Sequence, residues 1–130
     1  MNTDLKKELL KALAPVKRTL KEYKYYVKDL EEQTAKLQKM EDEKQEESDI
    51  NRQKYSVEET DGAKKQTYKT LAKFLDPLKE VIDKIDSNDS NDEDFLKSQQ
   101  EVKALNEYIQ AKEFIQEAQN IVDLEGAVNS

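Results

Sequence analysis

The sequence contains no cysteine, no histidine and no tryptophan, and it has only two glycines and two prolines in 130 residues. Without cysteine there is neither a disulfide nor a thiolate metal ligand. Without histidine the chain lacks the commonest general base and metal ligand near neutral pH. With glycine only at positions 62 and 126, no loop is suited to cradle a phosphate. We therefore expect a protein that is not an enzyme and that needs no cofactor or metal.

Long apolar runs are also missing. No segment approaches the roughly 20 apolar residues of a membrane span. Lys6, Lys7 and Lys11 interrupt the N-terminal stretch in which a signal peptide would be apolar. We expect a cytoplasmic protein with no membrane partner, and the length predicts a single domain over residues 1–130.

Charge is plentiful but uneven. Charged residues make up 39% of the chain and the net charge is −7. Residues 1–30 hold eight basic and four acidic groups, whereas residues 31–61 hold five and eleven. The acidic total argues against nucleic-acid binding, which needs dense neutralisation of phosphates. The basic first segment suits an acidic protein partner instead.

The most regular pattern is a ladder of apolar or nearly apolar residues at alternating spacings of four and three. This spacing predicts one buried stripe along a long helix. Weaker stripes follow between Leu71 and Ile85 and between Val102 and Val122. The rungs of the first ladder are Leu9, Leu13, Val16, Leu20, Tyr23, Val27, Leu30, Thr34 and Leu37.

Two polar runs, 41–49 and 86–92, separate these stripes. They predict helices near 4–43, 49–85 and 91–124, with Gly126 as a stop and Ser90 with Glu93 as a capping box. Short loops join antiparallel neighbours. The fold class is therefore all-α, an elongated antiparallel three-helix bundle (up-down-up) with coiled-coil-like packing.

Both prolines lie inside predicted helices. The ladder passes Pro15 without a change of phase, so we expect one kinked helix there rather than a short leading helix and a new start at Pro15. Pro77 lies between Leu75 and Leu78, again in phase, and predicts a bend.

Three short motifs follow one another along the chain: Val16-Lys17-Arg18 with Lys21-Glu22, Tyr23, Tyr26 and Lys36–Met40; Asp49–Gln53 followed by Glu58 and Glu59; and Glu107-Tyr108 with Ala111-Lys112. In order and spacing these motifs resemble the tubulin-binding cofactor A family, and the resemblance covers roughly residues 12 to 124. Two features depart from the family pattern: the second helix has Gly62-Ala63-Lys64-Lys65 where the family usually has a proline, and the segment from Asp86 to Lys97 looks longer and more acidic than usual.

This resemblance implies a three-helix bundle that acts as a tubulin-folding cofactor. Such a protein would capture β-tubulin released from the cytosolic chaperonin, without catalysis, in the cytoplasm and in association with the cytoskeleton. The alternative is a structural coiled-coil or scaffold subunit that oligomerises through its helical stripes. Three stripes of similar length joined by short breaks can close within one chain, which favours the monomer.

The outward side of the first helix is the first candidate binding surface. With the ladder facing inward, Arg18, Lys21, Tyr25 and Lys28 point away from the core. A basic stripe with one exposed tyrosine suits an acidic protein. The alternative is a solvated helix face held by charge pairs such as Arg18 with Glu22.

The second candidate is the first half of the second helix, Asp49 to Gln66, which is polar nearly all round. Such a helix is either supported by charge pairs or covered by a partner. Arg52, Gln53, Glu58 and Glu59 are therefore binding candidates, and ordinary solvation is the other interpretation.

The acidic loop 86–94 invites comparison with a calcium-binding loop. Aligning Asp86 as position 1 places Asn91 where glycine is needed and Lys97 where the bidentate glutamate belongs. We therefore reject an EF-hand.

Overall fold

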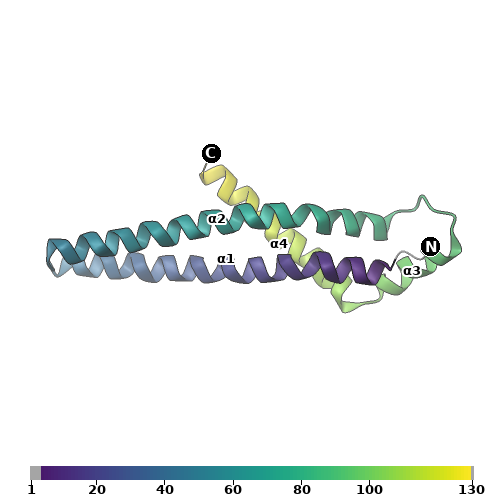
Figure 1. Ribbon diagram of the computed structural model, residues 1–130, viewed down its shortest axis with the longest axis horizontal. Coiled ribbons are helices and arrows are strands. Elements are labelled where there is room, and N and C mark those ends of the chain that lie inside the picture. Colours follow the sequence, from purple (N-terminus) through teal and green to yellow (C-terminus); the bar gives the residue numbers. More distant parts are fainter. Residues whose placement is uncertain (1–3, 130) are drawn as a thin grey trace.

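The computed structural model describes residues 4–129, and all its regular structure is helical. Its four helices are α1 (Leu5–Asp42), α2 (Glu47–Asp86), α3 (Glu93–Lys103) and α4 (Asn106–Val128). Figure 1 shows α1 and α2 lying antiparallel along most of the molecule, with α4 crossing them obliquely and α3 beyond their ends. The predicted all-α bundle with long antiparallel helices is confirmed. Among the described helices, none is both long enough and apolar enough to cross a membrane.

The third predicted helix, 91–124, is divided into α3 and α4. The chain leaves helical geometry at Leu105, whose ψ is 146°. Val102 and Tyr108 are both buried, yet six residues turn a continuous helix by roughly 240°, so they would face different directions. The break at Ala104–Leu105 lets both side chains reach the core.

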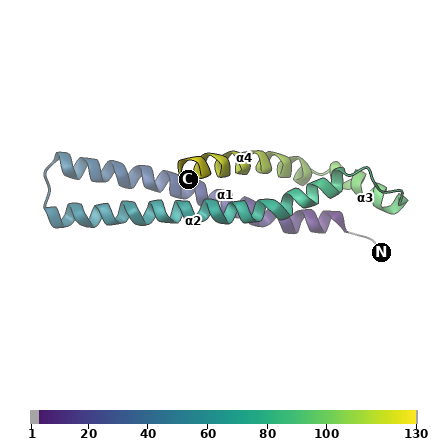
Figure 2. The same cartoon turned by 90° about the horizontal axis from the view of Figure 1, so that it is seen from above.

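Both prolines are accommodated inside continuous helices. Pro15 lies within α1 and Pro77 within α2. The prediction of one helix through Pro15, rather than two, is therefore confirmed. In Figure 2, α2 is bent in its C-terminal half, the half that contains Pro77.

The turn between α1 and α2 is closed by two characteristic backbone hydrogen bonds. Gln45 N–H donates to the Met40 carbonyl and Lys44 N–H to the Glu41 carbonyl, both at 3.1 Å. This pair of bonds is a Schellman motif, which places the residue after the C-cap in the left-handed region. Lys44 occupies that position with a φ of 52°, where glycine is normally favoured.

We expect Lys44→Gly to stabilise the protein by about 1 kcal/mol, because it removes the strain of a left-handed lysine. Thermal unfolding followed by circular dichroism should show a rise in Tm of about 3 to 5 °C. Lys54→Gly, two turns inside α2, is the control and should lower Tm, since glycine weakens a helix interior. A fall in Tm for Lys44→Gly would contradict this account of the turn.

The core occupies only one part of the α1–α2 pair. It is built from fully or nearly fully buried residues of α1 and α2, closed by Val102 from α3 and by Tyr108, Ala111 and Ala118 from α4. We call this part the proximal bundle. On the first ladder, burial is complete from Leu9 to Tyr23.

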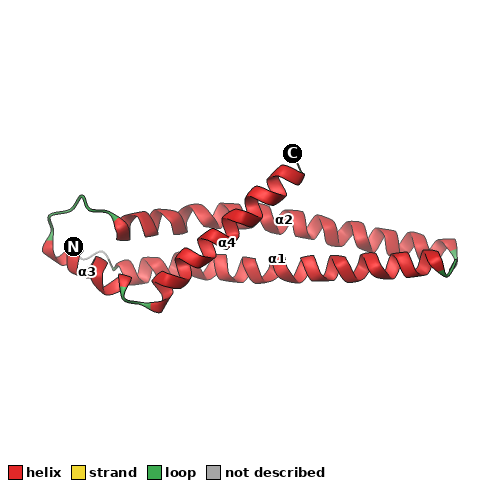
Figure 3. Cartoon of the chain, turned by 180° about the vertical axis from the view of Figure 1, so that it is seen from behind, coloured by secondary structure: helices red, strands yellow, loops and turns green. Residues whose placement is uncertain are grey.

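Beyond Lys24, which still contacts Glu117 of α4, the α1–α2 pair continues without cover from that helix, and Figures 2 and 3 show it projecting past the end of α4. We call residues 27–60 the distal hairpin. Here Val27, Leu30 and Leu37 are only half-buried and Thr34 is exposed. The ladder therefore has two structural roles, in a three-helix core and then in a thinner two-helix arm.

Polar side chains fix the returning segment to α2. Gln99 of α3 is buried and its Nε2 donates to the carbonyls of Lys84, at 3.0 Å, and Ser87, at 2.8 Å, at the C-terminal end of α2. Asp86 accepts a hydrogen bond from the Tyr108 hydroxyl and lies 3.3 Å from the Lys112 ammonium. Burial, together with this hydrogen bond, raises the pKa of Tyr108. These contacts set where α4 begins its path across α1 and α2.

Candidate protein-binding surface

The four predicted residues of α1 lie on its outer side. Arg18, Lys21, Tyr25 and Lys28 are all exposed, and the Tyr25 side chain is 64% exposed. They are held there because Val16, Leu20 and Tyr23, on the opposite side of the same turns, are buried in the core. The geometry leaves one large aromatic ring among cations on a rigid helix.

The charge pairs that would make this face an ordinary solvated one do not form. Within the described residues, Arg18, Lys21 and Lys28 make no ion pair, so the Arg18–Glu22 pair is not formed. Lys24, on the same part of α1, is paired with Glu117 of α4 at 2.6 Å. The neighbouring cations therefore keep their charge available to a partner.

Tyr25 is supported by a second tyrosine. The rings of Tyr25 and Tyr26 meet edge to face, with centroids 5.4 Å apart and planes at 72°. Because Tyr26 is half-buried beside the core stripe, it limits the positions that the exposed Tyr25 ring can adopt. A ring held in this way loses less conformational entropy on binding than a free one.

The four predicted residues of α2 divide between surface and interior. Arg52, Glu58 and Glu59 are exposed. Gln53 is only 6% exposed, and its Nε2 donates to the backbone oxygen and to Oε1 of Gln33, at 2.9 and 2.8 Å. The Gln53 amide thus joins α2 to α1 inside the distal hairpin and is occupied, so the surface proposed below omits it.

One exposed aromatic of α2 lies outside the residues singled out from the sequence. Tyr55 is 62% exposed, and a hydrogen bond with the Glu59 carboxylate is the main cause that raises its pKa. The available signal was a tyrosine four residues before a glutamate on an otherwise polar helix face. Tyr55 thus belongs with Arg52 and Glu59 on the distal hairpin.

The two candidate sets are not brought into contact. The α1 set lies alongside the region where Lys24 meets α4, whereas Arg52 and Glu59 flank Gln53, which faces Gln33 nearer the turn. Within the described residues, no hydrogen bond or ion pair joins one set to the other. Arg52 instead lines a groove of ≈ 580 Å³ near the turn, together with Lys36 and Lys39.

A buried polar cluster fixes the last turns of α4 against α1 and α2. The Tyr23 hydroxyl donates to Oε1 of Glu125 at 3.0 Å, and the Lys64 ammonium lies 3.4 Å from the same oxygen. Glu125 is 5% exposed, and its Oε2 has no hydrogen-bond partner among residues 4–129. Burial raises the pKa of Tyr23 to about 12, with smaller contributions from the hydrogen bond to Glu125 and from its charge.

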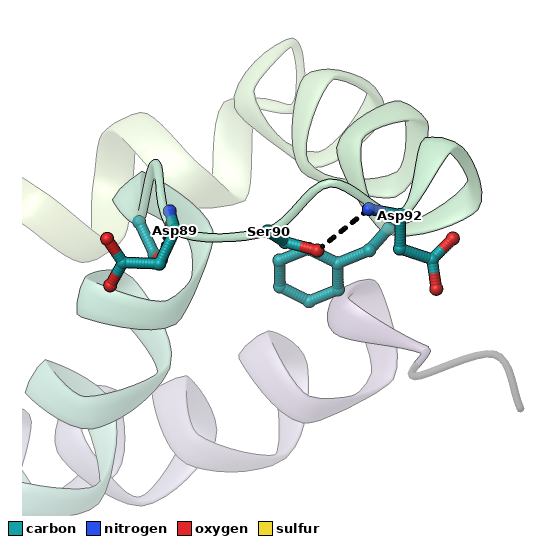
Figure 4. Close-up of a pocket in the computed structure, with 5 residues that line it drawn as sticks. Asp89, Ser90 and Asp92 are labelled. Atoms are coloured by element: carbon teal, nitrogen blue, oxygen red, sulfur yellow. Dashed lines mark hydrogen bonds between the residues drawn. The ribbon is translucent and has the colours of Figure 1, made fainter.

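The acidic loop 87–92 serves to start α3. The N-cap of α3 is Asp92, whose Oδ1 accepts a hydrogen bond from Asp94 N–H at 3.0 Å. The predicted N-cap, Ser90, lies two residues earlier, and its Oγ accepts from Asp92 N–H at 3.1 Å. Figure 4 shows the Asp89 and Asp92 carboxylates pointing away from each other. In the described part of the chain, no cluster of three or more carboxylates is arranged to hold a metal ion.

Comparison with known protein families identifies the family of this chain. The family described as tubulin binding cofactor A matches residues 4–102, which cover α1, α2 and all but the last residue of α3. Helix α4, with the closing motif Glu107–Lys112, lies beyond the match. Searches of curated proteins and of solved structures return no match. Since the matched residues make up well over half of the chain, this protein belongs to the tubulin binding cofactor A family of non-catalytic tubulin-binding chaperones.

Proposed function

We propose that this protein captures β-tubulin folding intermediates released from the cytosolic chaperonin and holds them by reversible surface binding. It would work in the cytoplasm, in association with the cytoskeleton. Family membership supports tubulin as the partner. The observation that carries the choice of surface is the exposed Tyr25 among the unpaired cations Arg18, Lys21 and Lys28.

The second part of the proposed surface is the distal hairpin, where Arg52, Tyr55, Glu58 and Glu59 are exposed. A client large enough to span both sets would contact α1 beside the core and α2 nearer the turn. The hairpin itself is thin and half-buried, so its exposed residues contribute little to the core. Their side chains are therefore free to serve binding.

We also propose that the working form is a monomer. Leu9, Leu13, Val16 and Leu20 are covered within the chain by the packing of α1 against the other helices. An oligomer is therefore not needed to bury the ladder. Light scattering on the purified chain tests this, and a stable dimer or trimer without affinity for tubulin would instead support the structural coiled-coil alternative.

The binding surface is tested by the triple variant Arg18→Glu, Lys21→Glu, Tyr25→Ala. We expect its affinity for β-tubulin to fall at least about tenfold, because Tyr and Arg are the usual interface anchors. Binding would be measured by capture of β-tubulin from cytosolic extract on the immobilised chain. Far-UV circular dichroism should be unchanged, since all three side chains are exposed.

The matched control is Lys69→Glu, Lys73→Glu, Leu124→Ala. It changes the charge by the same amount and removes one exposed apolar side chain, at residues of α2 and α4 outside the proposed surface. It should capture β-tubulin as well as the unmodified chain does. Equal capture by both variants would exclude the outer side of α1 as the binding surface.

A further inference from the structure

The unpaired positive charge on α1 extends well beyond the residues proposed above. Residues 5–28 contain eight basic and only two acidic residues, in a chain whose net charge is −7. Of the two acids, Glu8 is paired with Lys84 of α2 at 3.0 Å, which leaves Glu22 alone among the cations. Of the exposed cations on this segment that make no ion pair within the described residues, six lie on the side of α1 away from the core, and we call them the cationic stripe: Lys7, Lys11, Lys17, Arg18, Lys21 and Lys28.

This arrangement is unfavourable for the isolated helix. Lys7 with Lys11 and Lys17 with Lys21 are like charges four residues apart, and each such pair destabilises a helix by about 0.2 to 0.5 kcal/mol. Lys7 also lies near the N-terminal end of α1, where the helix dipole disfavours positive charge. Because these side chains are exposed and unpaired, the fold gains nothing from them.

We propose that the cationic stripe binds a linear acidic segment of a partner protein. The proposal rests on the proposed function, in which that partner is the tubulin client, and it adds the chemistry that the site recognises. From Lys7 to Lys28 the stripe runs roughly 32 Å along α1. An extended chain of about ten residues spans that length. Leu10, 41% exposed, and Tyr25 supply apolar contacts on the same side of α1.

A short acidic segment fits better than a membrane or a nucleic acid. Beyond the stripe, residues 31–61 carry five basic and eleven acidic groups. Since α1 continues to Asp42, a flat anionic bilayer or a long duplex laid along it would meet these carboxylates. A segment of about ten residues ends before them. The mixed charge along α1 therefore selects for a ligand of limited length.

A second copy of this chain is the other acidic candidate. Its exposed run 41–49 at the turn is rich in carboxylates. Docked on the stripe of another copy, with the two α1 helices antiparallel, that run would make a reciprocal contact that closes as a dimer. The experiment below separates this occupant from a foreign segment.

The test is fluorescence anisotropy of a fluorescein-labelled peptide of ten glutamates titrated with the full chain. We expect saturable binding that weakens several-fold between about 50 and 200 mM salt. Lys11→Glu, Arg18→Glu, Lys21→Glu should weaken it at least about tenfold, because three attractions become repulsions. The control with the same net charge, Lys69→Glu, Lys73→Glu, Lys97→Glu, should weaken it less than about twofold, since these exposed cations lie on α2 and α3.

Four results would overturn the proposal. The first is no binding of the peptide, and the second is equal weakening in the control variant. The third is tighter binding to duplex DNA, or to vesicles containing about one-third phosphatidylserine, than to the peptide. The fourth is an oligomer in light scattering that the stripe variant dissociates, which would make a second copy the occupant.

Capture of β-tubulin by the same variants separates this inference from the proposed function. Loss of peptide binding with normal capture removes α1 as the tubulin surface and leaves the acidic-segment site standing. If capture depends on the stripe but the peptide does not bind, α1 remains the tubulin surface and the acidic-segment site is ruled out.

Discussion

Leu71→Ala is expected to lower the free energy of unfolding by about 3 to 4 kcal/mol, whereas Leu37→Ala should lower it by only about 1 kcal/mol. Leu71 is 0% exposed and belongs to the proximal bundle, where α1, α2 and α4 meet. Truncating it leaves a cavity that three packed helices cannot close. Leu37 lies in the distal hairpin and is half-buried, so water already reaches part of its side chain.

Urea denaturation followed by circular dichroism at the helical minimum measures both values. The two variants remove the same atoms from helices of the same protein, so their difference reports the local packing alone. A milder substitution, Ile85→Val, should cost about 1 kcal/mol and remains measurable if Leu71→Ala does not fold. Equal losses at Leu71 and Leu37 would mean that the distal hairpin is packed as tightly as the bundle.

The second large effect is a loss of stability at high pH. The pKa of Tyr23 is raised to about 12 in the folded protein, against an ordinary value of 10.0. A raised pKa means that folding favours the neutral phenol. The contribution of the neutral Tyr23 phenol to the free energy of unfolding is therefore complete below pH 10, and it is lost as the pH rises from 10 to about 12. At one pKa unit per 1.36 kcal/mol, the difference corresponds to at most about 2 to 3 kcal/mol.

Urea denaturation at a series of pH values from neutral to about 12 tests this. Tyr23→Phe should be less stable than the unmodified chain at neutral pH by about 1.5 to 3 kcal/mol, since Glu125 loses a charge-assisted hydrogen bond. The same variant should then lose less stability between pH 10 and 12. Tyr25→Phe is the control, because the Tyr25 hydroxyl makes no hydrogen bond within the described residues, and it should follow the unmodified chain. Identical pH profiles for all three proteins would refute the role given to Tyr23.

The sequence predicts the long helices well because their apolar spacing has few alternatives. The ladder from Leu9 to Tyr23 is buried as its period requires, and polar runs mark both ends of α2. The break at Ala104–Leu105 was not predictable from local residues, because neither proline nor glycine marks it. It arises from the tertiary demand that Val102 and Tyr108 both reach the core. Local propensity does not register such a demand.

The candidate surface also has a part that the sequence predicts and a part that it does not. The outward direction of Arg18, Lys21, Tyr25 and Lys28 follows from the period of the ladder, since the inward residues are identifiable. No ladder of comparable strength fixes the rotation of α2 near Gln53, so its burial against Gln33 depends on a partner helix. The cluster of Tyr23 with Glu125 joins residues 102 apart in sequence, beyond the reach of any local pattern.

The position of the turn relative to the core also bears on how the chain folds. Contacts near the turn close short loops, such as the 20-residue separation between Gln33 and Gln53, but they bury little apolar surface. The contacts that bury most surface lie at the far end, where Glu8 and Lys84 are 76 residues apart. Closing the longer loop costs only about 1 kcal/mol more in chain entropy. We therefore expect the hairpin to form early from its turn, and the distant helix ends and α4 to come together later in folding.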